Sequence, residues 1–222
     1  MKQRKRKICV VGLGQFGSEL ARELAKYCEV LAIDINEDRV HAIAESVQRA
    51  LITDARDYST FSSLVGPDFD EAVVSLGESM EASILCTLHL KKIGVKVIRA
   101  KAMSEDHATI LRAIGATESI FPERETALRI AAQIVNPNLL DFIPLSEDFE
   151  VMDVAPPDAF HGRSLQDLSL RERFGVFVIA VKELVPPNFV FLPGPEFVIK
   201  LSDILVMIGR HGDLARIRDI GT

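Results

Sequence analysis

The feature that most constrains the fold is a glycine-rich turn near the N-terminus. An apolar run at 8–11 leads into Gly12-Leu13-Gly14-Gln15-Phe16-Gly17, and an amphipathic segment follows at 18–27. A second apolar run, 30–33, ends in Asp34, about 20 residues after the glycines. A strand, a Gly-x-Gly-x-x-Gly turn, a helix, a second strand and a carboxylate in this order are typical of a site for an adenine nucleotide.

Each glycine of the turn has its own mechanical role. Gly12 permits a tight turn, Gly14 lets a pyrophosphate approach the backbone, and Gly17 lets the helix pack close to the strand. The helix begins near Gln15 and Phe16, where free N–H groups and the positive end of the helix dipole attract phosphates. We therefore expect all five residues to bind a nucleotide. The alternative is a glycine turn kept only for packing.

Strand-like and helical patterns alternate from residue 7 to about residue 135. The predicted strands are 8–11, 30–34, 48–52, 71–75, 95–99 and 119–121, and the predicted helices are 16–26, 37–45, 60–65, 79–92, 105–114 and 123–135. Most of these strands are apolar throughout, as in a sheet that is buried on both faces. The alternation predicts an α/β fold, a Rossmann-type parallel sheet covered by helices on both faces.

The pattern changes after Asn136-Pro137-Asn138, where proline ends the last of these helices. We expect a nucleotide-binding domain at 1–138 and a small α+β domain at 139–222. In the second domain we interpret 139–146 as a connector. The predicted strands there are 149–154, 176–182, 189–192, 196–199 and 204–208, and the predicted helices are 164–173 and 213–218.

Composition and charge exclude several classes of protein. The 222 residues carry a net charge of −6, which argues against a nucleic-acid partner, so we interpret the basic run 1–7 as a solvated tail rather than a contact with lipid or nucleic acid. No apolar run reaches the roughly 18–20 residues of a membrane span, and the basic start lacks the apolar segment of a signal peptide. We therefore expect a cytoplasmic protein.

The sequence has three cysteines, Cys9, Cys28 and Cys86, which are too scattered for a zinc site or a disulfide framework. We interpret Cys9 and Cys86 as small core residues, because they lie in apolar segments.

Residues that follow the predicted strands are candidates for ligand contact, because ligands lie outside the carboxyl ends of parallel strands. Asp34 is expected to bind the ribose; the alternative is a cap for the next helix. The other candidates are Asn36 and Arg39 at the rim of the adenine, Asp54 and Ala55 at the adenine pocket, the backbone of segment 75–78, with Gly77, beside the ribose and phosphates, and Lys101 at the phosphates. The alternative for Asn36, Arg39 and Lys101 is an ordinary surface position.

Two carboxylates, Glu123 and Glu125, begin the helix predicted at 123–135. The helix dipole alone stabilises carboxylates at that position. A carboxylate close to nucleotide phosphates would repel them unless a divalent cation lay between. Glu123 is therefore also a candidate ligand of Mg²⁺ or Ca²⁺.

Catalytic groups are missing from the sequence. It has no Tyr-x-x-x-Lys pair and no Walker A lysine after the glycines, and its five histidines are spread singly. We interpret His89, on a mostly apolar helix, as a packing residue. A nucleotide site without catalytic groups indicates a sensor rather than an enzyme.

Three segments together resemble the RCK (KTN) domain: 10–17, 32–36, and Phe121-Pro122-Glu123 before a long helix. The proline-punctuated second domain is similar to the C-terminal RCK domain (TrkA-C) of the same family. The resemblance to KtrA/TrkA-type regulatory subunits of potassium channels and transporters thus covers nearly the whole chain.

The resemblance implies a homo-oligomer, with dimers assembled into an octameric ring that docks under a membrane K⁺ channel at the inner face of the membrane. ATP, ADP, NAD⁺ or NADH would bind the N-terminal domain and change the shape of the ring, which gates the pore. It also implies a ribose contact for Asp34, a divalent cation between subunits at Glu123, pairing of subunits through helix 123–135, and, as in some relatives, cyclic di-AMP at 168–175.

Gln15 departs from the family pattern, because KtrA-like members usually carry an arginine there that meets the terminal phosphate of ATP. Glutamine brings no charge, so this route to discriminating ATP from ADP is in doubt, and NAD(H) or ADP is the expected ligand. The leading hypothesis is a nucleotide-sensing gating-ring subunit. The alternatives are an NAD(H)-dependent oxidoreductase, which needs a substrate pocket with a proton donor, and a redox-sensing repressor, which needs a basic winged helix.

Overall fold

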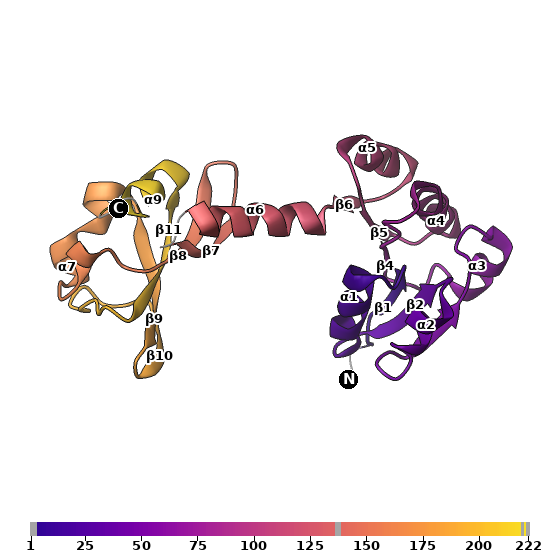
Figure 1. Ribbon diagram of the computed structural model, residues 1–222, viewed down its shortest axis with the longest axis horizontal. Coiled ribbons are helices and arrows are strands. Elements are labelled where there is room, and N and C mark those ends of the chain that lie inside the picture. Colours follow the sequence, from indigo (N-terminus) through magenta and orange to yellow (C-terminus); the bar gives the residue numbers. More distant parts are fainter. Residues whose placement is uncertain (1–3, 136–138, 219, 221–222) are drawn as a thin grey trace. The chain divides into compact units, whose positions relative to one another are not determined.

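The computed structural model describes residues 4–135, 139–218 and 220 (Figure 1). Its contacts divide the chain into two compact units, Met1–Glu123 and Arg124–Thr222. Each unit has hydrophobic clusters of its own. The domain boundary predicted between residues 138 and 139 adjoins 136–138, which lie outside the described residues.

The first unit contains a parallel sheet of the Rossmann type, which confirms the predicted fold class. Its strands are β1 (Lys7–Val11), β2 (Glu29–Asp34), β3 (Arg49–Ile52), β4 (Glu71–Val74), β5 (Val97–Lys101) and β6 (Glu118–Ile120). They lie in the order β3-β2-β1-β4-β5-β6, and every neighbouring pair is parallel. The helices are α1 (Gln15–Ala25), α2 (Glu37–His41), α3 (Tyr58–Leu64), α4 (Met80–Ile93) and α5 (Glu105–Ile114), and α6 (Pro122–Val135) follows β6.

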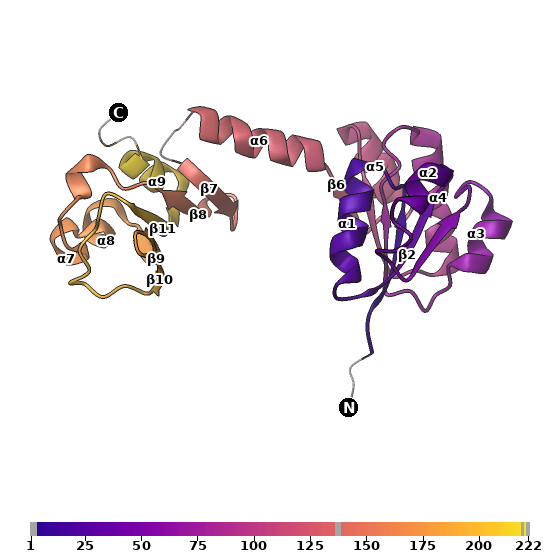
Figure 2. The same cartoon turned by 60° about the horizontal axis from the view of Figure 1, so that its bottom comes forward.

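Helices cover both faces of this sheet (Figure 2). On one face, Val10 of β1 packs in a cluster with Val40 of α2. On the other face, Cys9 of β1 packs in a cluster with Cys86 of α4 and Leu111 of α5. Successive residues of β1 therefore serve two cores, which explains why the strand is apolar throughout. The prediction that Cys9 and Cys86 are core residues is confirmed, and burial raises the pKa of both thiols.

The described part of the basic N-terminal run differs from the expected solvated tail. Arg4 lies 3.4 Å from Asp70, Arg6 2.8 Å from Glu71, and Lys7 2.7 Å from Asp68. Acidic residues just before β4 and at its first position thus neutralise the basic run beside them. The sequence did not indicate this pairing, because the two segments are more than sixty positions apart.

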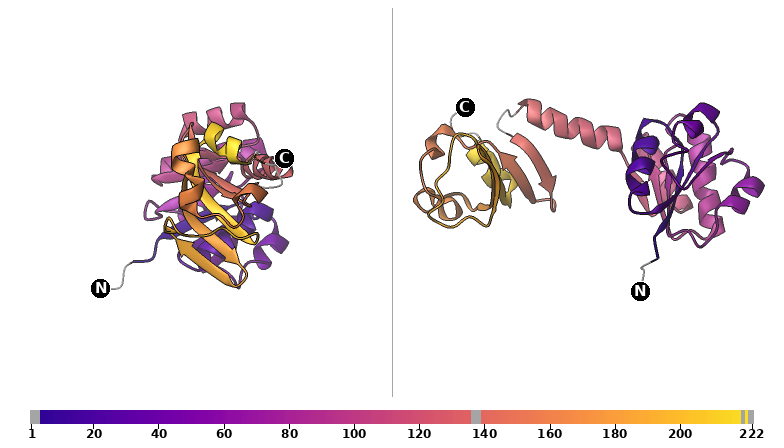
Figure 3. Two further views of the ribbon diagram at one scale, coloured as in Figure 1. Left: turned by 90° about the vertical axis from the view of Figure 1, so that its left-hand side faces the viewer. Right: turned by 90° about the horizontal axis from the view of Figure 1, so that it is seen from below.

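The second unit is built on an antiparallel sheet (Figure 3). Its strands are β7 (Leu139–Pro144), β8 (Phe149–Val154), β9 (Phe177–Leu184), β10 (Pro187–Phe191) and β11 (Asp203–Arg210), in the order β10-β9-β11-β8-β7. Besides most of α6, its helices are α7 (Leu165–Leu168), α8 (Leu170–Phe174) and α9 (His211–Arg218), with a 3-10 turn at Asp158–Phe160. The connector expected at 139–146 is wrong, because its first six residues form β7 and pair with β8.

Two further predictions in this unit are wrong. The helix expected at 164–173 is broken at Ser169, which has a left-handed φ of 45°. The break lets Leu168 and Leu170 both point into the core, which two positions so close in one continuous helix cannot do. The strand expected at 196–199 is irregular, and Val198 makes only an isolated bridge to Ser164.

Within the described part of the chain, no helix combines the length and the apolar composition that a crossing of the bilayer requires.

Candidate nucleotide-binding site

The glycine turn packs tightly between the end of β2 and the residue that follows β4. Gly12 has a φ of +93°, and its N–H donates to the carbonyl of Ile33 at 2.8 Å. A Cβ on Gly12 would lie 2.6 Å from the carbonyl oxygen of Ser75, and a Cβ on Gly17 would overlap the carbonyl oxygen of Gly12. A Cβ on Gly14, by contrast, would meet no protein atom within 4 Å. The turn and packing roles of Gly12 and Gly17 are thus built into the fold, while Gly14 borders open space.

Helix α1 begins at this open space. Gly14 is its N-cap residue and provides no side-chain acceptor, and the first turn contains no acidic residue. Gln15 is exposed, Phe16 is half-buried, and the Ser18 hydroxyl donates to the carbonyl of Leu13. The first N–H groups of α1 therefore lack a side-chain cap, which is the condition under which a helix N-terminus accepts a phosphate.

Asp34 ties the end of β2 to the glycine turn. Its side chain is only 4% exposed and accepts hydrogen bonds from the N–H of Leu13 at 2.6 Å and of Asn36 at 2.8 Å. The alternative that Asp34 caps α2 is wrong, because Asn36 occupies the N-cap and accepts from the N–H of Arg39. Asp34 instead accepts the N–H of Leu13 and so fixes the glycine turn at the end of β2.

Arg39 lies between two carboxylates. Its guanidinium is 3.8 Å from Asp34 and 2.9 Å from Glu78, which follows β4, and the bond to Glu78 is the main cause that raises the pKa of Arg39. The prediction placed only the backbone of segment 75–78 beside the ribose and phosphates, and it did not include the Glu78 side chain. The signal available in the sequence was the place of this segment after a buried strand.

Asp54 and Ala55 follow β3, at the same edge of the sheet. Asp54 accepts side-chain hydrogen bonds from Nε and Nη2 of Arg56, which lower the pKa of the Asp54 carboxyl. Ala55 is buried, and its carbonyl lies 3.0 Å from Nδ1 of His89 on α4. A carbonyl can only accept, so Nδ1 of His89 is the donor. His89 is thus a satisfied packing residue, as expected, and it also fixes the loop that holds Ala55.

Lys101 and Glu123 form an ion pair with each other. The Lys101 side chain is 16% exposed, whereas that of Glu123 is 70% exposed, and the ammonium lowers the pKa of the Glu123 carboxyl. A Cβ on Gly77 would lie 3.4 Å from Nζ of Lys101. The structure therefore joins Gly77, Lys101 and Glu123 into one group, and Gly12, Asp34 and Arg39 into another.

Within the described residues, no three acidic, histidine or cysteine side chains form a cluster suited to a metal ion.

Comparisons with known proteins decide the family. The TrkA-N domain model matches residues 8–122, and the TrkA-C domain model matches residues 150–220. The chain belongs to the Ktr/TrkA family. It is 37% identical to the Ktr system potassium uptake protein C of Bacillus subtilis, over 96% of each chain. It is 32% identical to the Ktr system potassium uptake protein A of the same organism, over 98% of each chain.

Solved structures show the same fold at lower identity. A structure described as the GsuK channel bound to NAD is 18% identical, with a TM-score of 0.64 over 97% of this chain and 39% of that chain. The TrkA-N domain of the inner membrane protein ybaL from Escherichia coli is 21% identical, with a TM-score of 0.51 over 60% of this chain. These likenesses confirm the fold of a Ktr/TrkA-family chain.

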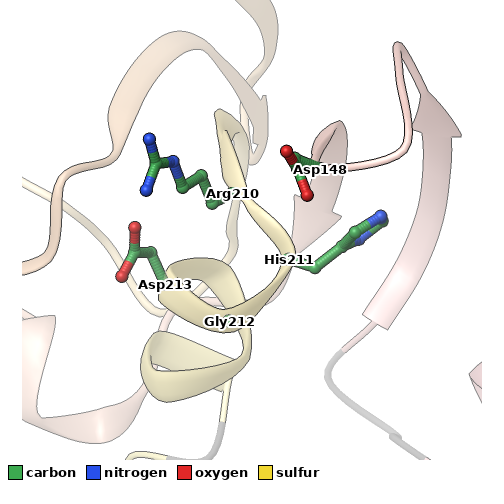
Figure 4. Close-up of a pocket in the computed structure, with 5 residues that line it drawn as sticks. All are labelled: Asp148, Arg210, His211, Gly212 and Asp213. Carbon is green, nitrogen blue, oxygen red and sulfur yellow. The ribbon is translucent and has the colours of Figure 1, made fainter.

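The TrkA-C domain carries a surface pocket at the start of α9 (Figure 4). The pocket is lined by Asp148, Arg210, His211, Gly212 and Asp213. Figure 4 shows Arg210 and Asp213 on one side of the junction between β11 and α9, and Asp148 and His211 on the other. Acidic and basic groups alternate around it, so the pocket does not present a single sign of charge.

The stretch expected to bind cyclic di-AMP, 168–175, contains the end of α7 and all of α8. Leu168 and Leu170 are buried in the core of the domain, and Arg173 donates to the carbonyl of Leu168 at 3.3 Å. Gly175 has a φ of +73°, and a Cβ there would lie 3.3 Å from Asp213. The stretch thus ends beside the pocket of Figure 4.

His89 offers a test of the predicted contact between Ala55 and an adenine ring. His89→Phe keeps an aromatic ring beside Tyr58 but removes the donor to Ala55, so we expect ADP to bind about three- to tenfold more weakly, the equivalent of one lost hydrogen bond. His89→Asn places an amide N–H close to the position of Nδ1, and we expect near-normal affinity. The measurement is calorimetric titration with ADP. Equal affinities for the wild type and His89→Phe would contradict a role for this contact.

Proposed function

We propose that this chain is the nucleotide-sensing regulatory subunit of a K⁺ uptake channel or transporter. The observation that carries the proposal is the open, uncapped start of α1 beside Gly14, in a chain that is similar over nearly its whole length to Ktr potassium uptake proteins. Such a subunit lies at the inner face of the membrane through its partner. The proposal assigns no catalytic step to the chain.

The proposed ligand is an adenine nucleotide, either ADP or ATP, or NAD⁺ or NADH. Asp34 would hold the ribose, the first N–H groups of α1 would hold phosphate oxygens, and Lys101 would add a positive charge. Gln15 lies exposed at the first position of α1, so it would face the phosphates without bringing a charge. A nucleotide acts as a signal only through unequal affinity for two conformations of the assembly.

The direct experiment is calorimetric titration of the full chain with ATP, ADP, NAD⁺ and NADH, with and without Mg²⁺ or Ca²⁺. We expect at least one of these ligands to bind in the micromolar range. No binding at millimolar concentration would refute the sensor proposal. Thermal shift gives a rapid preview, because a ligand present at 100 times its Kd adds about 2.7 kcal/mol to the free energy of unfolding.

The proposed assembly is a homo-oligomer of dimers that forms an octameric ring, with α6 pairing subunits. Light scattering on the purified chain, with and without nucleotide, measures this directly. Cyclic di-AMP is a further proposed ligand, at 168–175 of the TrkA-C domain. A titration of Arg173→Ala tests that assignment, because Arg173 is the cationic side chain anchored beside Leu168.

Glu123 is the proposed ligand of a divalent cation. It is exposed and its carboxyl stays ionised beside Lys101, so a cation could replace the ammonium there and leave Lys101 to the phosphates. We expect Glu123→Gln to abolish the effect of Mg²⁺ or Ca²⁺ on nucleotide affinity and to leave affinity in EDTA within about twofold, because an exposed ion pair contributes little.

Calorimetric titration in EDTA and in each metal measures both quantities. Glu125→Gln, which makes the same charge change in the same helix, is the control and should keep the metal effect. Loss of nucleotide binding by Glu123→Gln in EDTA would contradict the assignment.

A further inference from the structure

An ion pair spans the carboxyl end of β1. Arg39 belongs to α2, which follows β2, and Glu78 belongs to the connection that follows β4. Strand β1, with its glycine turn, lies between β2 and β4 in the sheet. The 2.9 Å contact of Arg39 with Glu78 therefore joins the segments that follow the two strands on either side of β1.

The same guanidinium also shields Asp34. Both carboxylate oxygens of Asp34 accept backbone N–H groups, Arg39 lies 3.8 Å from one of them, and only 4% of the side chain is exposed. A nucleotide that binds Asp34 would therefore come within reach of Arg39. This step rests on the function proposed above.

We propose that Glu78 competes with the nucleotide's phosphate for Arg39. Without nucleotide the guanidinium is held by Glu78, and when a phosphorylated adenine nucleotide binds, the guanidinium transfers from the carboxylate to a phosphate oxygen. The fork of N–H donors on arginine matches carboxylates and phosphates equally well, so one group can replace the other. Glu78 thus sets the nucleotide concentration at which the site fills.

The exposure of the pair makes the exchange feasible. The Glu78 side chain is 83% exposed and that of Arg39 39% exposed, so water and salt screen their attraction. Such pairs are held weakly, and a phosphate carrying more charge than a carboxylate can displace Glu78. Glu78→Gln should therefore leave the fold intact and release Arg39 for the ligand.

The test is a double-mutant cycle read by calorimetric titration with ADP and with adenosine. We expect Glu78→Gln to bind ADP about two- to fivefold more tightly than the wild type, the range set by an exposed ion pair. Adenosine, which has no phosphate, should bind the two proteins equally. In an Arg39→Gln background, Glu78→Gln should no longer change the affinity for ADP. The control, Glu81→Gln, makes the same charge change nearby in α4 and should have no effect.

Three outcomes would overturn the proposal. Unchanged or weaker ADP binding by Glu78→Gln would show that Glu78 does not compete. A gain that persists in the Arg39→Gln background would show plain repulsion of phosphate by Glu78, without transfer of Arg39. An equal gain for adenosine would show that the ion pair only blocks access. If the wild type itself bound neither ADP nor any other nucleotide, the proposed function would fail, and this inference with it.

Discussion

Asp34→Ala is expected to abolish binding of adenine nucleotides. The carboxylate that would accept the ribose hydroxyls disappears, and the N–H of Leu13 loses its acceptor at 2.6 Å, so the glycine turn is no longer tied to β2. The loss of two charge-assisted hydrogen bonds, from the ribose hydroxyls to the carboxylate, predicts that the nucleotide binds at least about a hundredfold more weakly. Calorimetric titration with ADP and NAD⁺ measures the loss.

Two matched variants separate the contributions of Asp34. Asp34→Asn keeps the shape and one oxygen acceptor, so it removes the charge together with one of the two backbone hydrogen bonds, from Leu13 or from Asn36. Asp38→Ala removes a carboxylate from the first turn of helix α2 and leaves Asp34 and the glycine turn unchanged, so this variant should bind nucleotide normally. Nucleotide affinity of Asp34→Ala within threefold of the wild type would contradict the ribose assignment.

Gly17→Ala is expected to destabilise the first unit severely, whereas Gly14→Ala is expected to spare its stability and block the ligand. A Cβ at residue 17 overlaps the backbone oxygen of Gly12, which cannot move away as a flexible side chain could. Overpacking of this kind costs about 3 kcal/mol and lowers the Tm by roughly 10 °C. A Cβ at residue 14 meets only open space, and its methyl group occupies the room that a pyrophosphate needs.

Thermal unfolding followed by circular dichroism, together with titration of each variant, distinguishes these effects. The expected pattern is a large fall in Tm for Gly17→Ala, a small one for Gly14→Ala, and loss of nucleotide affinity in Gly14→Ala. If Gly14→Ala bound nucleotide as the wild type does, the phosphates would not lie against that residue.

The first unit could be predicted closely from the sequence because its signals are local. Strands buried on both faces produce apolar runs, and Gly12 to Gly17 is a turn with steric demands that few other residues meet. The second unit was harder to predict, because two of its helices, α7 and α8, span only four and five residues. Segment 139–144 carries no clear alternation of apolar and polar residues, yet it pairs with β8. The break at Ser169 depends on the burial of Leu168 and Leu170, which only the packed core determines.

The residues of the candidate site also fall into those that a local sequence pattern predicts and those that only the folded structure brings together. The glycines and Asp34 follow a local pattern with known spacing. The contacts that tune the site join distant residues: Arg39 to Glu78 across 39 positions, His89 to Ala55 across 34, and Lys101 to Glu123 across 22. A single sequence carries no signal for which cation meets which carboxylate. That information arises only when the sheet places the ends of its strands side by side.

The position of β1 between β2 and β4 also dictates when the site can form during synthesis of the chain. Gly12 packs against the backbone of Ser75, so the glycine turn lacks one wall until the ribosome has released the segment that contains β4. Until then β1 and β2 can pair, but one edge of β1 stays open to other strands. Parallel pairing between distant segments is slow, because the intervening loop must close first. A growing chain therefore passes through a stage in which its most distinctive motif is already made but cannot yet hold a ligand.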